Sequence, residues 1–144
     1  MKIKNKVLVA FLAIVAVAAL FWILSIPKGV EGTTDRQNYN LGDALEIEIK
    51  NNLGAQVCFS SCYPYLIEWK NKDGLWEQYS YDDCGEADIA ADCVPANGTK
   101  RFRLPLLDME TGLNRLKIPV CVDCSEGREF AQESVLYSNE FQVD

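Results

Sequence analysis

The 144 residues of this chain contain no histidine. Histidine is the most common general base beside a serine or cysteine nucleophile, so its absence excludes the familiar hydrolase triads. The sequence also lacks a Gly-x-Ser-x-Gly turn, a phosphate-binding glycine loop and a dinucleotide-binding fingerprint. Together these absences indicate that the protein is not an enzyme and needs no cofactor.

Helical spacing of apolar residues is absent outside the N-terminal segment, where one long apolar run begins at Val7 and ends at Ile26. About 20 apolar residues are what a helix needs to cross a bilayer. Three lysines precede the run and acidic residues follow it, which favours a cytoplasmic N-terminus. We therefore expect a cytoplasmic stub at 1–6, a transmembrane anchor at 7–26 and an extracytoplasmic remainder.

A cleaved secretory signal is the alternative reading of this run, because Ala16 and Ala18 form a small-x-small pattern. The apolar residues continue past that pattern through Leu24, which favours an uncleaved anchor. Both readings place the rest of the chain outside the cytoplasm.

Beyond the anchor we expect a linker at 27–32 and one domain at 33–144, a common size for a single hydrophobic core. All 21 acidic residues and 11 of the 14 basic ones lie beyond residue 26, which leaves that part with a net charge of −10. Such a charge repels nucleic acid, so we expect none as a partner.

Apolar residues in this domain alternate with polar ones, which is typical of half-buried strands. Examples are "ALEIEIKN" (44–51), "RFRLPL" (101–106) and "LNRLKIPVCV" (113–122), and "YLIEWKNKDGLWEQY" (65–79) predicts a hairpin. Pro105 and Pro119 indicate edge positions or bulges. The sequence therefore predicts an all-β fold: an immunoglobulin- or fibronectin-like antiparallel β-sandwich with one N-terminal transmembrane helix.

Turn and core residues also resemble those of immunoglobulin-like domains on bacterial and archaeal cell surfaces, which carry Tyr-x-x-Gly-Asp, a Gly-x-Trp hairpin and a closing Ser-x-Glu-Phe strand. The matching residues are Tyr39, Gly42, Asp43, Asn51, Gly74, Trp76, Ser138, Glu140 and Phe141. A secondary similarity, in the strand ending in Asn and the Gly-x-Trp hairpin, is to the small β-sandwich proteinase inhibitor of bacilli. These resemblances imply a fold and carry no catalytic residues.

Six cysteines in an oxidising compartment point to disulfides. The cysteines are Cys58, Cys62, Cys84, Cys93, Cys121 and Cys124. Spacing leaves the pairing open: Cys84 bonds Cys93, or reaches back to Cys58 or Cys62, and Cys121 and Cys124 pair locally or with the remainder.

Two less favoured readings assign chemistry to the cysteines. Cys58, Cys62, Cys121 and Cys124 have a spacing that a four-thiolate metal site accepts. Cys121 and Cys124 also match the Cys-x-x-Cys of redox enzymes, but they follow a strand pattern rather than a helix start.

Surface chemistry offers further candidates. Tyrosine is favoured in protein and glycan contacts, and the candidate binding residues are Tyr63, Tyr65, Tyr79 and Tyr81. Asn97 begins an Asn-Gly-Thr glycosylation sequon. A group of acidic residues favours a solvated surface loop over a calcium site. The residues are Asp82, Asp83, Glu86, Asp88 and Asp92.

These observations predict a membrane-anchored, disulfide-stabilised extracytoplasmic domain that acts in interaction, adhesion or envelope assembly, with the membrane and a surface protein or glycan as partners. Three alternatives stay open: a proteinase inhibitor, a structural filament subunit, and a metal or thiol redox protein.

Overall fold

The protein is described here by a computed structural model that covers residues 29–80, 83–107 and 109–144. The predicted stub at 1–6 and anchor at 7–26 lie outside these residues. Within the described ranges, no helix is long and apolar enough to cross a membrane.

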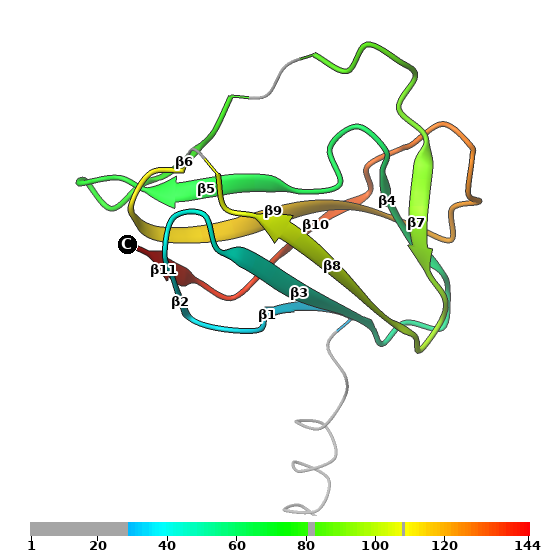
Figure 1. The fold of residues 1–144 in the computed structure, drawn as a ribbon. Helices are drawn as coiled ribbons and strands as arrows, with labels where there is room; N and C mark the ends of the chain where they lie inside the picture. The colour runs from blue at the N-terminus through cyan, green and yellow to red at the C-terminus, as the bar shows by residue number, and fades with distance from the viewer. Residues whose placement is uncertain (1–28, 81–82, 108) are drawn as a thin grey trace, which may run out of the picture.

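The described residues form β-strands joined by turns and loops (Figure 1). The strands are β1 (Val30–Thr34), β2 (Asn38–Tyr39), β3 (Ala44–Asn51), β4 (Val57–Ser60), β5 (Leu66–Lys70), β6 (Trp76–Gln78), β7 (Ala90–Val94), β8 (Thr99–Pro105), β9 (Gly112–Val122), β10 (Ser134–Tyr137) and β11 (Phe141–Val143).

The strands make two sheets that pack face to face. The smaller sheet has the order β1-β3-β8, and the larger sheet has the path β2-β11-β9-β4-β7, with β10, β5 and β6 attached to it. Neighbouring strands run antiparallel except β11 and β2, which are parallel. The predicted all-β sandwich is therefore confirmed.

Between the sheets lies a core of alternating side chains from both layers. Ile47 and Ile49 of β3 face Leu116 and Ile118 of β9, each at most 3% exposed. The alternation read in the sequence places these residues inward and their charged neighbours outward, because successive side chains of a strand point to opposite faces.

The long strand β9 lies at the centre of the larger sheet, and its neighbour on one side is interrupted. β5 pairs with β9 from Leu66 to Trp69, and β4 pairs with it from Val57 to Phe59. Pro119 lies level with the gap between them. A proline was expected at an edge strand or a bulge, because proline has no N–H to donate. The central strand β9 tolerates Pro119 because no residue of β4 or β5 is paired at this level, so no hydrogen bond between strands is lost.

Part of the linker predicted at 27–32 is a strand in the structure, and residues 27 and 28 lie outside the described residues. Val30 pairs with Asn51 and Gly32 with Ile49, so the first strand of the sandwich begins at residue 30 rather than 33. Its apolar content is low, and the sequence offered no alternation to reveal it.

Candidate functional site

One long side of the sandwich is closed by direct contacts between the sheets. Gly32 of β1 forms a bridge with Ser138, which follows β10. Beside it, Thr34 N donates to Asn139 Oδ1 at 2.8 Å and Asn139 Nδ2 donates to Thr34 Oγ1 at 2.7 Å. A Cβ on Gly32 would lie only 3.3 Å from Leu136 Cδ2, so glycine permits this close approach.

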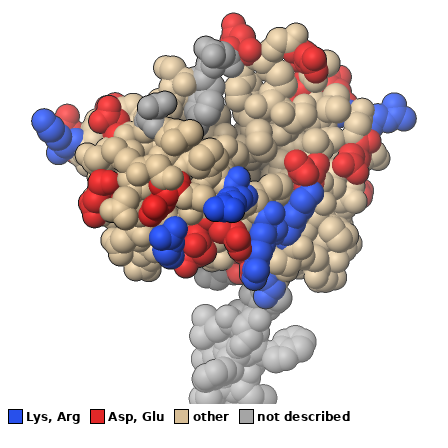
Figure 2. All heavy atoms as spheres, viewed as in Figure 1, with Lys and Arg blue, Asp and Glu red and all other residues tan. Residues whose placement is uncertain are grey.

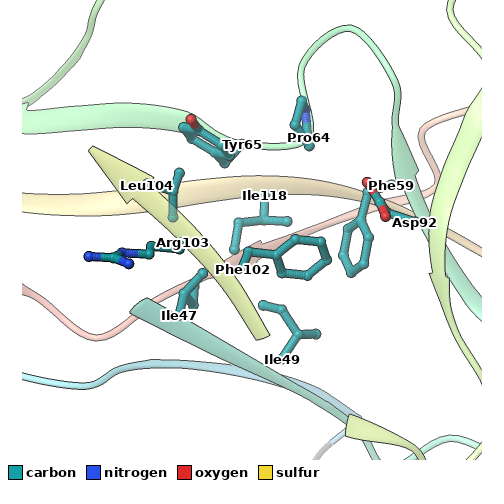
Figure 3. Close-up of a pocket in the computed structure, with 10 residues that line it drawn as sticks. All are labelled: Ile47, Ile49, Phe59, Pro64, Tyr65, Asp92, Phe102, Arg103, Leu104 and Ile118. Atoms are coloured by element: carbon teal, nitrogen blue, oxygen red, sulfur yellow. The ribbon is translucent and has the colours of Figure 1, made fainter. Parts of the chain in front are cut away.

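The opposite side of the sandwich is open. Between β8 and the segment before β5 lies an apolar slot of about 130 Å³ that reaches the core (Figure 3). Its lining comes from both sheets: Ile47, Ile49, Phe59, Pro64, Tyr65, Asp92, Phe102, Arg103, Leu104 and Ile118. The slot exists because β4 and β5 are interrupted at 61–65, where no strand closes the gap to β8.

Aromatic rings form the walls of the slot. Phe59 and Phe102 meet edge to face with ring centroids 5.4 Å apart, and Ile118 lies beside them (Figure 3). Tyr65 stands on the opposite wall, where burial raises the pKa of its phenol. The interior is thus suited to an apolar side chain rather than to a charged ligand.

Two charged residues, Asp92 and Arg103, are among the residues that line the slot. Lys100 Nζ and Asp92 Oδ1 form an ion pair at 2.7 Å. Away from the slot, on the outer face of the smaller sheet, Arg101 pairs with Glu46 and Glu48 of β3. Figure 2 shows basic and acidic side chains mixed on the molecular surface. In the described part of the chain no carboxylate pairs with Arg103, whose side chain points away from the slot in Figure 3.

The six cysteines form three disulfides, as expected for the cysteine content. The pairs are Cys58–Cys93, Cys62–Cys84 and Cys121–Cys124. The alternative that Cys84 bonds Cys93 is wrong: β7 places Cys93 beside β4, and Cys84 lies in the preceding loop, within reach of Cys62.

The four-thiolate arrangement suggested for Cys58, Cys62, Cys121 and Cys124 is not assembled. Cys62 bonds Cys84 in the loop above the slot, and Cys58 bonds Cys93. Glu133 brings a carboxylate oxygen within 4.8 Å of Cys121 and Cys124 Sγ, but both sulfurs belong to one disulfide. Metal binding there would require reduction first.

The predicted tyrosine surface does not form one patch. Tyr65 lines the slot, while Tyr79 packs its ring on Trp69 at 4.6 Å and its hydroxyl accepts from Glu110 N. Tyr63 is half-buried in the 61–65 loop, and Tyr81 lies outside the described residues.

The acidic group and the sequon also have definite places. Asp88 accepts hydrogen bonds from the hydroxyls of Ser60 and Ser61 and so holds the loop after β4, while Asp92 pairs with Lys100. Asp82 lies outside the described residues. Asn97 is exposed in the turn between β7 and β8 with a φ of 55°.

A second surface feature, a cluster around Arg115, was not predicted from the sequence. On the outer face of the larger sheet, Arg115 lies 4.2 Å from the ring centroids of both Trp76 and Tyr137 and bonds Glu68 Oε2 at 2.6 Å. Four strands bring these residues together: the consecutive strands β5 and β6, and the consecutive strands β9 and β10. Only the outward position of Arg115 in the alternation of β9 hinted at it.

No protein-family model matches the chain, and no curated protein matches it in sequence. Solved structures with a similar fold include the following three. The MSP family member WR4 of C. elegans is 12% identical, with 77% of this chain and 95% of that chain covered and a TM-score of 0.41. A CARDB domain from Pyrococcus furiosus in complex with di-metal ions is 11% identical, with 83% and 90% covered and a TM-score of 0.38.

The third is the alkylpurine DNA glycosylase AlkC of Pseudomonas fluorescens bound to abasic-site DNA, at 14% identity and a TM-score of 0.38; the match covers 79% of this chain and only 30% of that one. At these scores none of the three adds to what the strand order already shows. The similarity to the bacillar proteinase inhibitor gains no support from them.

Proposed function

We propose that this protein is a membrane-anchored, extracytoplasmic interaction domain that binds a protein partner at the open side of its sandwich and performs no catalysis. The observation that carries the proposal is the asymmetry of the fold. The Gly32 side is closed by a backbone bridge and the Asn139 hydrogen bonds, whereas on the β8 side the slot, lined by the partly buried Tyr65 and Phe102, leads to the core. An apolar recess with a charged rim is the usual composition of a protein contact.

The disulfides fit this role in an oxidising compartment. Cys62–Cys84 ties the loop that follows β6 to the loop above the slot, and Cys58–Cys93 joins β4 to β7. Cross-links of this kind restrict the unfolded chain and hold an exposed binding surface in one shape. The anchor at 7–26 and the location outside the cytoplasm belong to the proposal and rest on the charge and length of the apolar run.

Site-specific photo-cross-linking in membranes of the source cells tests the binding surface. A benzoylphenylalanine in place of Tyr65 probes the slot, and one in place of Tyr137, which is 44% exposed on the far face of the larger sheet, is the matched control. We expect one discrete protein adduct from position 65, identified by mass spectrometry, and a marked loss of that adduct when Arg103→Glu is added.

Equal adducts from both positions, adducts to glycan or lipid alone, or none from position 65 would refute a protein partner at the slot. Topology is tested separately: protease added to intact spheroplasts should degrade residues 33–144 of the full chain, and protection of the domain would contradict the extracytoplasmic placement.

A further inference from the structure

The edge strand β8 offers unused backbone hydrogen-bonding groups next to the slot. β8 is the last strand in the order β1-β3-β8, and Figure 1 shows it at the border of its sheet. An edge strand presents a row of N–H and C=O groups to which another extended chain can pair.

The register of β3 and β8 identifies which groups face outward. Asn51 N donates to Gly98 O at one end of the ladder, and Leu106 N donates to Asp43 O at the other. Bonded residues alternate along an antiparallel pair, so the even-numbered residues 98–106 bond β3. Thr99, Arg101 and Arg103 therefore direct their backbone groups away from the sheet, and Pro105 ends the row because it has no N–H.

The slot lies where the side chains of an added strand would point. Phe102 and Leu104 of β8 face inward and line the slot, so alternate residues of a neighbouring strand would enter the same space. A dry cavity of roughly 150 Å³ holds a benzene-sized group. The slot, at about 130 Å³, therefore has room for one apolar side chain of comparable size.

The charges on β8 indicate which outward side chains the added strand should carry. In the pairing of β3 with β8, Glu46 lies opposite Arg103 and Glu48 lies opposite Arg101. Arg101 is paired with both carboxylates, whereas Arg103 has no described ion-pair partner. A strand on the free edge of β8 that carries acidic residues at alternate positions would pair with the cation of Arg103.

We infer that β8 binds an extended segment of the partner protein as an added strand. One apolar side chain of that strand occupies the slot, and an acidic side chain at an alternate position forms an ion pair with Arg103. This inference rests on the proposed function and specifies how the same site binds. Strand β3, "ALEIEIKN", already pairs with β8 on its other edge and has this pattern, so a peptide of that sequence is a suitable probe.

Fluorescence anisotropy of the labelled peptide against the full chain in nanodiscs provides the test. Arg101→Pro removes an outward N–H but no ladder bond to β3, and Arg101→Ala removes the same side chain while keeping that N–H. We expect Arg101→Pro to weaken peptide binding at least tenfold relative to Arg101→Ala, and the peptide to slow amide hydrogen exchange at 99–103. Equal affinities for the two variants, or no binding by the unmodified chain, would overturn the inference.

A second measurement needs no protein variant. Two peptides N-methylated at alternate sets of positions are compared, one at the Leu and Ile residues and one at the Glu residues. A paired strand directs only one set of N–H groups toward β8, so one peptide should lose binding tenfold or more and the other should retain it; equal losses would contradict strand addition.

The cross-link at position 65 separates this inference from the proposed function. If that cross-link persists unchanged in Arg101→Pro, a partner binds the slot through side chains alone and the strand inference falls. If the cross-link is absent without any variant, the proposed function itself falls. A concentration-dependent dimer that Arg101→Pro abolishes would identify a second copy of this chain as the occupant and overturn the assignment to another protein.

Discussion

Cys58 lies directly opposite Cys121 in the pairing of β4 with β9, yet the two sulfurs belong to different disulfides. The register between β4 and β7 shifts between Val57 and Phe59, which brings Cys93 beside Cys58 on the other side of β4. Cys121 instead bonds Cys124 in the turn that ends β9. The three neighbouring strands thus carry two disulfides in one region of the larger sheet.

The two disulfides should differ strongly in their effect on stability. Cys58–Cys93 closes a loop of 35 residues and Cys121–Cys124 one of only 3. From loop entropy we expect the double variant Cys58→Ala/Cys93→Ala to lose about 4 kcal/mol and Cys121→Ser/Cys124→Ser about 1.5 kcal/mol. Urea unfolding of the two variants without reductant measures both losses, and equal losses would contradict the pairing.

Asn51 should be the most sensitive polar residue of the core. Its side chain is fully buried, donates to Ala55 O and Pro95 O, and accepts from Leu53 N. Asn51→Ala leaves these groups without partners, so we expect a loss of about 3 kcal/mol in unfolding free energy. The neighbouring Asn52→Ala, at a partly exposed position, is the control and should change stability by less than about 0.5 kcal/mol.

The Arg115 stack should contribute through Glu68, whose side chain is only 9% exposed. Arg115→Ala leaves that carboxylate with only the more distant ammonium of Lys117, at 4.0 Å. We therefore expect a loss of about 2 kcal/mol, less than for a fully buried pair. The double variant with Glu68→Gln should recover part of the loss. Additive losses in this cycle, measured by urea unfolding, would show that the two groups are not coupled.

Asp35 should make stability depend on acid. Burial opposes its ionisation, but hydrogen bonds from Tyr39 Oη at 2.7 Å and Glu46 N at 2.9 Å, with the Arg36 cation, hold the pKa below its ordinary value of 3.8. Because the folded-state pKa is lowered, the stabilisation is present above pH 3.8 and is lost as the pH falls through the folded value.

The variant Asp35→Asn tests this pH dependence. The difference in urea midpoint between the unmodified chain and Asp35→Asn should be full at neutral pH and shrink below pH 3.8. A difference that stays constant through the acid range would show that the ionised carboxylate is not the stabilising form.

Local patterns predicted much of the fold, since alternation is a property of neighbouring residues. The strand at 44–51 and the hairpin around Gly74 have the predicted bounds within a few residues, because side-chain direction in a strand needs no knowledge of its partner. β1 was missed because its few apolar residues give no alternation, and its strand conformation depends on pairing with β3.

The site itself could not be predicted, because its parts come from distant segments. Tyr65 was named as a binding residue, and it lines the slot, but the sequence suggested a tyrosine patch rather than an apolar recess. The recess depends on Phe59 meeting Phe102 across the two sheets and on the break between β4 and β5.

The sequence by itself determined that this chain forms strands with one buried face, and its six cysteines favoured disulfides, because alternation and composition are local or additive properties. Tertiary structure alone decided which cysteines pair, which side of the sandwich closes at Gly32 and which opens beside β8. Those features depend on strand register and sheet order, which arise from contacts between residues far apart in the chain and leave no trace in the pattern of any one segment.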